Sequence, residues 1–236
     1  RISRAEQELF LNQTHAYLGR MVAVVAHELK NPLMIIRGSA ERLAKKSESP
    51  EADYVREEVD RLNQIVSGYL EFARADRPLI AAEEIQTFDL TELIANVRRH
   101  FEQRYGGDKV RWLTPSPPAA ISLRGYPRSL RQILLNLLIN GAEACEAAGR
   151  DIAVGVETEV EDAIVRLMVV DHGPGFERRE IRRAFTPFRT TKLKGSGLGL
   201  YLSKKIIEEM GGSIEIKSKA GEGTRVIIVL PGKTKG

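Results

Sequence analysis

A histidine followed by an acid interrupts an apolar helical pattern in VVAHELKNPLMIIRG, residues 24–38. Wound as one α-helix at about 100° per residue, this region gathers apolar side chains within about 80° of Val25: Met21, Val22, Leu29, Leu33 and Ile36. His27 falls at about 200° on the same projection, away from the apolar stripe. The pattern therefore predicts a solvent-facing imidazole, a side chain that can serve as a nucleophile.

Two amides lie four residues apart in the apolar stretch LRQILLNLLINGAEA, residues 130–144. Residues at this spacing share one face of a helix, so Asn136 and Asn140 are expected to point the same way. A buried amide without a partner costs about 1 to 3 kcal/mol, and both side chains should therefore have partners. Hydrogen bonding between helices would satisfy them, but together with the motifs that follow we favour a ligand or metal site.

An acid ends an apolar strand pattern in VVDHGPGF, residues 169–176. The Asp171 carboxylate can accept a hydrogen bond from an exocyclic amine. Gly173 and Gly175 lack side chains, which would allow a flat ring to approach the backbone. Taken alone, such a glycine pattern is often only a turn.

A polar, basic loop containing Arg189 and Lys192 leads into the glycines of GSGLGL, at Gly195, Gly197 and Gly199, and then into a helical pattern. Glycines before a helix leave its free N–H groups open to a phosphate. No Gly-Lys-Ser/Thr follows and no strand stands immediately before, so a mobile lid explains the loop better than a Walker motif. In GEGTRVIIVL, residues 221–230, Thr224 begins the last strand pattern, where either a turn or a polar contact to a bound base is open.

The elements that must position these side chains fall into two regions. Residues 2–46 and 51–75 carry helical periodicity around a polar turn, and they predict an antiparallel helical hairpin. Two helices leave apolar faces uncovered, so we expect a second copy of the chain to complete a dimeric four-helix bundle.

A break at residues 75–86 predicts a linker, after which helical and strand patterns mix. Strands are expected at 86–90, 109–113, 119–123, 151–160, 163–171, 212–218 and 224–230, and helices at 90–104, 127–148 and 198–210. This half predicts an α/β sandwich, a mixed sheet with helices on one face. The expected boundaries are 1–76 for the hairpin, 77–86 for the linker and 87–236 for the α/β domain.

Composition narrows the class of protein. Thirty-six basic and 32 acidic residues give a net charge of +4, without a dense basic cluster interleaved with aromatics, so no nucleic-acid contact is expected. One cysteine excludes an internal disulfide and a multi-thiolate metal site, which favours a reducing compartment. No apolar run is long enough for a membrane span and the first residues do not form a signal peptide, so we expect a cytoplasmic portion, perhaps of a longer membrane-anchored sensor.

The order and spacing of the motifs resemble those of two-component sensor histidine kinases over nearly the whole chain. HELKNP is similar to the phosphoacceptor box, NLLINGAEA to the asparagine box, DHGPG to the first glycine box, FTPF to the phenylalanine box and GSGLGL to the second glycine box. The resemblance implies a dimerisation and phosphoacceptor hairpin followed by a Bergerat-type ATP-binding domain, the fold shared with gyrase, the heat-shock-90 chaperones and MutL proteins.

The resemblance implies that His27 accepts the phosphoryl group, in agreement with the helical projection. Glu28 would accept the ring proton as the nitrogen attacks. Asn31, at about 240° and so beside His27, would help orient a hydrolytic water, which implies phosphatase activity toward the partner's acyl phosphate. The implied partners are a second copy of the chain and the receiver domain of a response regulator. Transfer within or between protomers stays open, since it depends on the handedness of the hairpin.

For the nucleotide domain, the resemblance implies ATP and Mg²⁺ as cofactors. Asn140 would be the Mg²⁺ ligand and Asn136 a second polar contact near the phosphates. Asp171 would read adenine, with Thr224 nearby through water. In the lid, Arg189 and Lys192 would neutralise charge during phosphoryl transfer, and Gly195, Gly197 and Gly199 would let the lid close on the phosphates.

The sequence departs from the family pattern at two positions. His172 stands where many members carry asparagine, and Glu143 stands where several relatives have a basic residue, so neither is assigned a role. Two other hypotheses compete: a Bergerat-fold ATPase clamp without phosphohistidine, and a non-catalytic dimeric scaffold. The clamp would not need an exposed His-Glu pair on a dimerising hairpin, and a decayed scaffold would have no reason to keep Asn140, Asp171 and the lid glycines.

Overall fold

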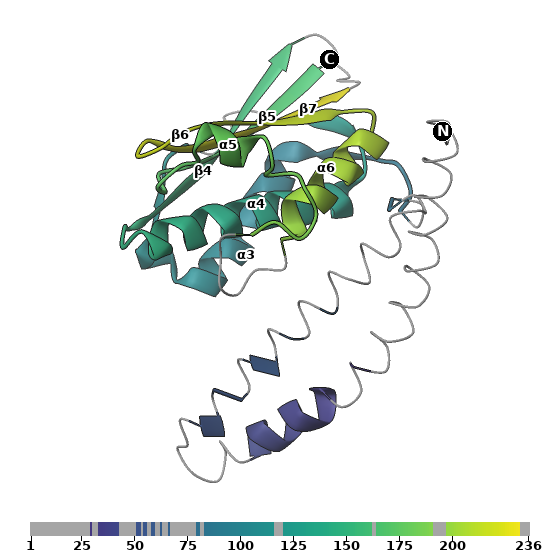
Figure 1. Cartoon of the computed structure of the whole chain (residues 1–236). Helices are drawn as coiled ribbons and strands as arrows, with labels where there is room; N and C mark the ends of the chain where they lie inside the picture. Colours follow the sequence, from purple (N-terminus) through teal and green to yellow (C-terminus); the bar gives the residue numbers. More distant parts are fainter. Residues whose placement is uncertain are drawn as a thin grey trace, which may run out of the picture. The chain divides into compact units, whose positions relative to one another are not determined.

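The computed structural model describes a defined subset of the chain, comprising residues 29, 33–42, 51–52, 54–55, 58–59, 62, 66, 79–80, 83–115, 120–161, 164–190 and 197–231. The chain divides into two compact units, one of residues 1–79 with 187–202 and the other of residues 80–186 with 203–236. Figure 1 shows the described elements of the chain, coloured along the sequence.

The first unit contains two helical stretches that pack on one another. Residues 33–42 are helical, and the described positions between 51 and 66 are helical as well. Leu33 of the first stretch clusters with Val59 and Val66 of the second, and all three are buried. This packing agrees with the predicted hairpin.

The same two stretches leave large apolar side chains uncovered in the single chain. Met34 and Ile35 are 68% and 69% exposed, and Tyr54 is 69% exposed. Leu29 and Ile36, which the helical projection placed on the apolar stripe, are 46% and 45% exposed. An apolar surface of this kind is typical of a protein–protein contact.

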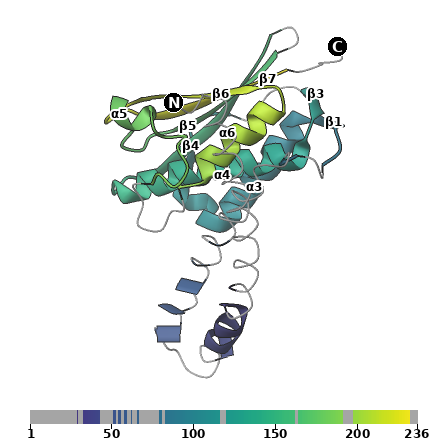
Figure 2. The same ribbon diagram turned by 45° about the vertical axis from the view of Figure 1, so that its right-hand side comes forward.

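The second unit is an α/β sandwich, as the sequence predicted. Its elements, with the helix that enters it, are β1 Gln86–Asp89, α3 Leu90–Tyr105, the 3-10 turn η1 Gly107–Lys109, β2 Val110–Trp112, β3 Ser122–Gly125, α4 Pro127–Ala147, β4 Ile152–Glu161, β5 Ile164–Asp171, α5 Arg178–Ile181, α6 Gly199–Glu209, β6 Ser213–Lys219 and β7 Gly223–Pro231. Five strands form a mixed sheet in the order β2-β4-β5-β7-β6, in which β2 and β4 are parallel and the other pairs antiparallel. Helices α3, α4 and residues 203–209 of α6 lie on one side of this sheet (Figures 1 and 2).

The first and third strands do not join the main sheet. β1 pairs with β3 in an antiparallel two-stranded sheet of their own, with Phe88 opposite Leu123. The predicted strand at 119–123 accordingly lies further along the chain, at 122–125. The strand patterns located these segments, but they do not specify pairing partners, because those depend on which backbone edges the packing leaves free.

Local signals set the ends of the long helices. The Asp89 carboxylate caps α3 by accepting from the backbone N–H of Thr91 at 2.8 Å. Helix α4 begins with Pro127 and has no side-chain cap of its own. Glu83, from the predicted linker, supplies one, since its carboxylate accepts from the N–H groups of Arg128 at 2.6 Å and Ser129 at 3.0 Å. Part of the predicted linker is therefore packed against the start of α4 in the α/β domain.

The tyrosine at the end of α3 titrates abnormally because of where it packs. Its ring lies 4.7 Å from that of Phe101, and burial followed by the negative charge of Glu143 raises the pKa of Tyr105 above its ordinary 10.0. The neutral phenol is therefore favoured in the folded state, a stabilisation fully present below about pH 10 and lost as the pH rises through the folded pKa. We expect the phenolate absorbance that Tyr105→Phe removes to develop with a midpoint above pH 10 in the native chain. A midpoint at or below pH 10 would contradict the packing.

Candidate nucleotide site

The end of β5 brings a carboxylate against the asparagine-bearing helix. Register in the sheet places Asp171 opposite Thr224 of β7. A Cβ added to Gly141 of α4 would lie 2.9 Å from the Asp171 Cβ, so this glycine permits the close approach of helix and strand. Asn140 immediately precedes Gly141 and is half-buried. The structure therefore brings together Asp171, Thr224 and the part of α4 that carries Asn140.

Two glycine-containing loops border the Asp171 carboxylate. Its Oδ1 accepts from the Gly173 backbone N–H at 2.8 Å. Gly175 has φ +69°, and an added Cβ would lie 2.2 Å from the Lys219 carbonyl oxygen. Gly223 has φ +96°, and an added Cβ would lie 2.1 Å from the Asp171 carbonyl oxygen. Both positions thus require glycine for backbone conformation and for space.

A pair of glycine variants separates these two requirements. Gly221→Ala and Gly223→Ala both place an alanine at positive φ, but only at Gly221 is there open space around the new Cβ. The left-handed conformation alone costs about 1 to 2 kcal/mol. We expect Gly223→Ala to lower the free energy of unfolding by about 2 kcal/mol more than Gly221→Ala, as for overpacking. Urea denaturation measures this difference. Equal losses of unfolding free energy in the two variants would show that the backbone around Gly223 shifts to accommodate the added Cβ.

One of the two asparagines of α4 is bonded to another helix. The Asn136 side-chain N–H donates to the Ser203 hydroxyl of α6 at 3.1 Å, and Ser203 is 3% exposed. Asn136 is thus satisfied by the helix–helix hydrogen bond that sequence reasoning kept open. Its amide oxygen can still accept or coordinate, so a role near the phosphates is compatible with this bond.

The lid residues are described in part. Gly197 has φ +69°, and an added Cβ would lie 2.6 Å from the backbone of both Phe188 and Arg189. The backbone at the two ends of the loop therefore approaches closely at this glycine. Arg189 is exposed, and Gly199 is the first residue of α6. Lys192 and Gly195 lie outside the described residues, as do the phosphoacceptor candidates His27, Glu28 and Asn31.

The two residues that depart from the family pattern lie near this site. His172 is exposed, and its Nδ1 lies 3.5 Å from an Arg111 guanidinium nitrogen. Glu143 is half-buried on α4 and acts on the pKa of Tyr105. Neither position acquires a role in nucleotide chemistry from these contacts.

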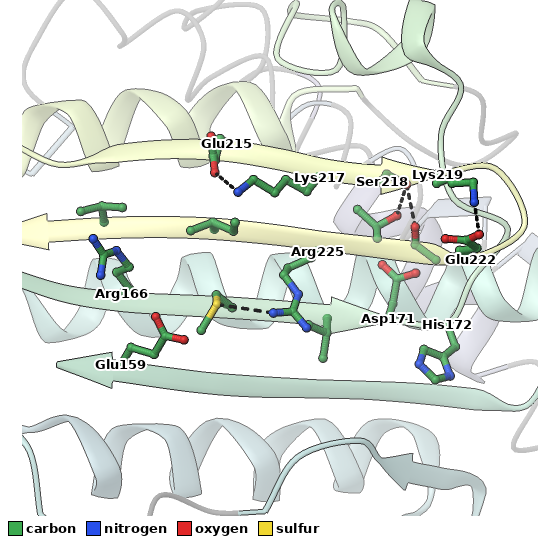
Figure 3. A pocket seen from close by; sticks show the side chains of 16 residues that line it. Glu159, Arg166, Asp171, His172, Glu215, Lys217, Ser218, Lys219, Glu222 and Arg225 are labelled. Atoms are coloured by element: carbon green, nitrogen blue, oxygen red, sulfur yellow. Dashed lines mark hydrogen bonds and ion pairs between the residues drawn. The ribbon is translucent and has the colours of Figure 1, made fainter. Parts of the chain in front are cut away.

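A broad, shallow pocket covers the sheet face opposite α4. It is floored by Met168, Val170 and Ile227 and bordered by charged side chains such as Arg166 and Glu215. In Figure 3, Asp171, His172, Ser218 and Lys219 gather at one end of this pocket, whereas Glu159 and Arg166 lie toward the other. Only that first end borders the predicted purine site, so the pocket as a whole is not the nucleotide slot.

The donor set at Asn140 is compatible with magnesium. Within the described part of the chain, no three His, Cys, Asp or Glu side chains gather into a metal-binding cluster. An amide oxygen from Asn140 would leave most coordination positions to phosphate oxygens and water. Mg²⁺ is commonly bound in this way, with few protein ligands and several retained waters.

Two family models match separate parts of the chain. Residues 17–78 match the family model described as "His Kinase A (phospho-acceptor) domain". Residues 125–234 match that described as "Histidine kinase-, DNA gyrase B-, and HSP90-like ATPase". The chain belongs to the sensor histidine kinase family.

Individual relatives agree with these family matches. The chain is 33% identical over 220 residues to the sensor histidine kinase ZraS of Klebsiella oxytoca, which covers 91% of the chain and 46% of ZraS. The chain thus spans about half the length of that relative. It superposes on full-length ShkA in complex with AMPPNP with a TM-score of 0.69 and 26% identity, over 92% of this chain and 46% of ShkA.

A further structural relative contains a partner protein. The histidine kinase ThkA in complex with the response regulator TrrA gives a TM-score of 0.65 and 29% identity, over 98% of this chain and 66% of that one. The phosphoacceptor-domain match does not favour the alternative of an ATPase clamp. No helix among the described residues of this chain has the length and apolar character needed to cross a membrane.

Sequence reasoning missed several residues that shape the site. Gly141 and Gly223 lay inside quoted motifs but were not assigned a role, because only the packing reveals what a side chain there would strike. Ser203 was not singled out, since nothing local marks it as a partner for a residue 67 positions away. Arg150 and Ser218 gave no local signal either.

Proposed function

We propose that this histidine kinase uses Mg-ATP to phosphorylate its own His27 and passes the phosphoryl group to an aspartate of a response regulator. A neutral imidazole nitrogen of His27 attacks the γ-phosphorus, the bond to the β–γ bridging oxygen breaks and ADP leaves. Glu28 accepts the ring proton as the new P–N bond forms. At a pKa near 6.5, a histidine is largely neutral at pH 7 and therefore available for attack.

The observation that carries this proposal is the convergence at the end of β5. Asp171 lies opposite Thr224 and against Gly141, so an adenine acceptor and the helix of the proposed metal ligand meet at one edge of the ATPase fold. We assign adenine recognition to Asp171, with Thr224, Gly173 and Gly175 around the ring. Asn140 would bind Mg²⁺, which would neutralise phosphate charge, and Asn136 would contact the phosphates.

The lid would supply the remaining charge. Arg189 and Lys192 would neutralise the transferring phosphoryl group, which is mainly a task of positioning and electrostatics. Gly195, Gly197 and Gly199 would permit closure over the phosphates. In support, ShkA has been crystallised with AMPPNP, an analogue of ATP.

We further propose that the chain acts as a homodimer. Its domains would be the phosphoacceptor hairpin at 1–76, the linker at 77–86 and the ATP-binding domain at 87–236. The chain would lie in the cytoplasm, tethered to a membrane sensor. The uncovered side chains of Met34, Ile35 and Tyr54 would be buried against the second copy. The response regulator is the proposed partner because ThkA binds one, TrrA. Asn31 would give the chain a phosphatase activity toward that regulator.

Labelling with ATP tests the proposed reaction. The chain is incubated with γ-labelled ATP and Mg²⁺, and the label is examined for acid lability and base stability, with a chelator as the control. A phosphohistidine predicts label that acid removes and base does not, and that the chelator prevents. ATP turnover without covalent label would instead favour a clamp ATPase, and no nucleotide binding would favour a scaffold.

A further inference from the structure

The loop of residues 172–175, which follows Asp171, is held by contacts from other parts of the fold. Residues 172–175 read His-Gly-Pro-Gly, and two glycines give a loop large conformational freedom that must be restricted on folding. This loop begins directly after Asp171, so its conformation decides where the Asp171 carboxylate lies. The contacts that restrict this loop come from side chains elsewhere in the fold.

The first anchor is the arginine that follows α4. Helix α4 ends at Ala147, Gly149 follows with φ +64°, and the Arg150 N–H donates back to the Cys145 carbonyl at 2.9 Å, which turns the chain toward β4. From this turn, Arg150 Nη1 donates to the carbonyl oxygens of His172 at 3.0 Å and Gly173 at 2.7 Å. The same nitrogen lies 3.4 Å from the Gly221 carbonyl oxygen. One guanidinium thus joins the loop after β5 to the turn before β7.

The second anchor is a serine on β6. The Ser218 hydroxyl accepts from the Phe176 N–H at 2.8 Å and donates to the Gly223 carbonyl at 2.7 Å. It also lies 3.2 Å from the Thr224 hydroxyl, and Figure 3 shows it at the Asp171 end of the pocket. The backbone adds a direct link, because the Gly221 N–H donates to the Pro174 carbonyl at 2.7 Å.

We propose that Arg150 and Ser218 are positioning residues for purine recognition. They hold the loop of residues 172–176 and the turn of residues 219–223 in one register, so that the Asp171 carboxylate meets the exocyclic amine of adenine. Neither side chain is needed to touch the nucleotide. The inference rests on the proposed function, in which ATP is the nucleotide.

Discrimination between two nucleotides separates positioning from general stability. Purine riboside triphosphate lacks the amine that Asp171 would accept from, but it keeps the ring, the ribose and the phosphates. We measure the dissociation constants of Mg-ATP and of this analogue for the whole chain and for Arg150→Met, Arg150→Lys and Ser218→Ala. Arg166→Met serves as the matched control, since Arg166 pairs with Glu161 at 2.7 Å in a surface ion pair away from the loop.

If the loop without its anchor places the Asp171 carboxylate correctly in about one tenth of the molecules, the affinity for ATP falls about tenfold. We expect this loss for Arg150→Met, with binding of the analogue nearly unchanged, a partial recovery in Arg150→Lys and a loss in the same direction in Ser218→Ala. In Arg166→Met, the ratio of the dissociation constant of the analogue to that of Mg-ATP should equal the parent ratio. If the variants keep that ratio too, or lose both nucleotides equally, the inference is wrong while the proposed function stands. Should Arg150→Met not fold, Arg150→Lys and Ser218→Ala decide. If the parent chain binds neither nucleotide, both fail.

Discussion

His27→Gln is expected to abolish acid-labile labelling by γ-labelled ATP while leaving nucleotide binding at the parent level. Glutamine keeps a polar side chain on the proposed solvent-facing side of the helix, but its amide nitrogen has no available lone pair for attack on phosphorus. Position 27 lies outside the described residues, so this expectation comes from the sequence projection and from the phosphoacceptor-domain match over residues 17–78. The measurement is the acid-labile label per chain, with ATP affinity determined in parallel.

His100 offers a matched control for this experiment. It is an exposed histidine of α3 and stands in no recognised motif. His100→Gln should label like the parent chain. If His27→Gln retains acid-labile label, or if His100→Gln loses it, the assignment of the phosphoacceptor is wrong and another nucleophile must be sought.

Asp171→Asn is expected to weaken Mg-ATP binding by about 100-fold, which corresponds to about 3 kcal/mol and to the loss of a hydrogen bond to a charged acceptor. The asparagine carbonyl can still accept from the Gly173 N–H, the bond that Asp171 Oδ1 makes at 2.8 Å. The other side-chain position becomes an NH₂ donor, however, and would face the donor amine of adenine. Calorimetric titration with Mg-ATP measures the effect.

The matched control is Asp151→Asn, at an exposed acid one residue before β4. It removes the same charge from the same domain, so a difference between the two variants reports on position and not on net charge. We expect Asp151→Asn to bind ATP within about twofold of the parent, as for an exposed charge. Parent-like affinity in Asp171→Asn would mean that adenine is read elsewhere.

The sequence by itself determined the class of fold and most of its elements. Periodicity located α3 and α4, because this signal acts within a few residues. Alternating patterns located β4 to β7 in the same way. The motifs also identified Asp171 and Thr224 as candidates, and the structure places them opposite one another in the sheet.

Only the tertiary structure decided which distant groups meet. It paired β1 with β3 apart from the main sheet, gave Asn136 a partner in Ser203 and placed Glu83 on the start of α4. It also brought Arg150 onto the loop after β5. The physical reason is range: caps and periodicity depend on neighbouring residues, whereas these contacts join residues tens of positions apart and follow from strand register and core packing.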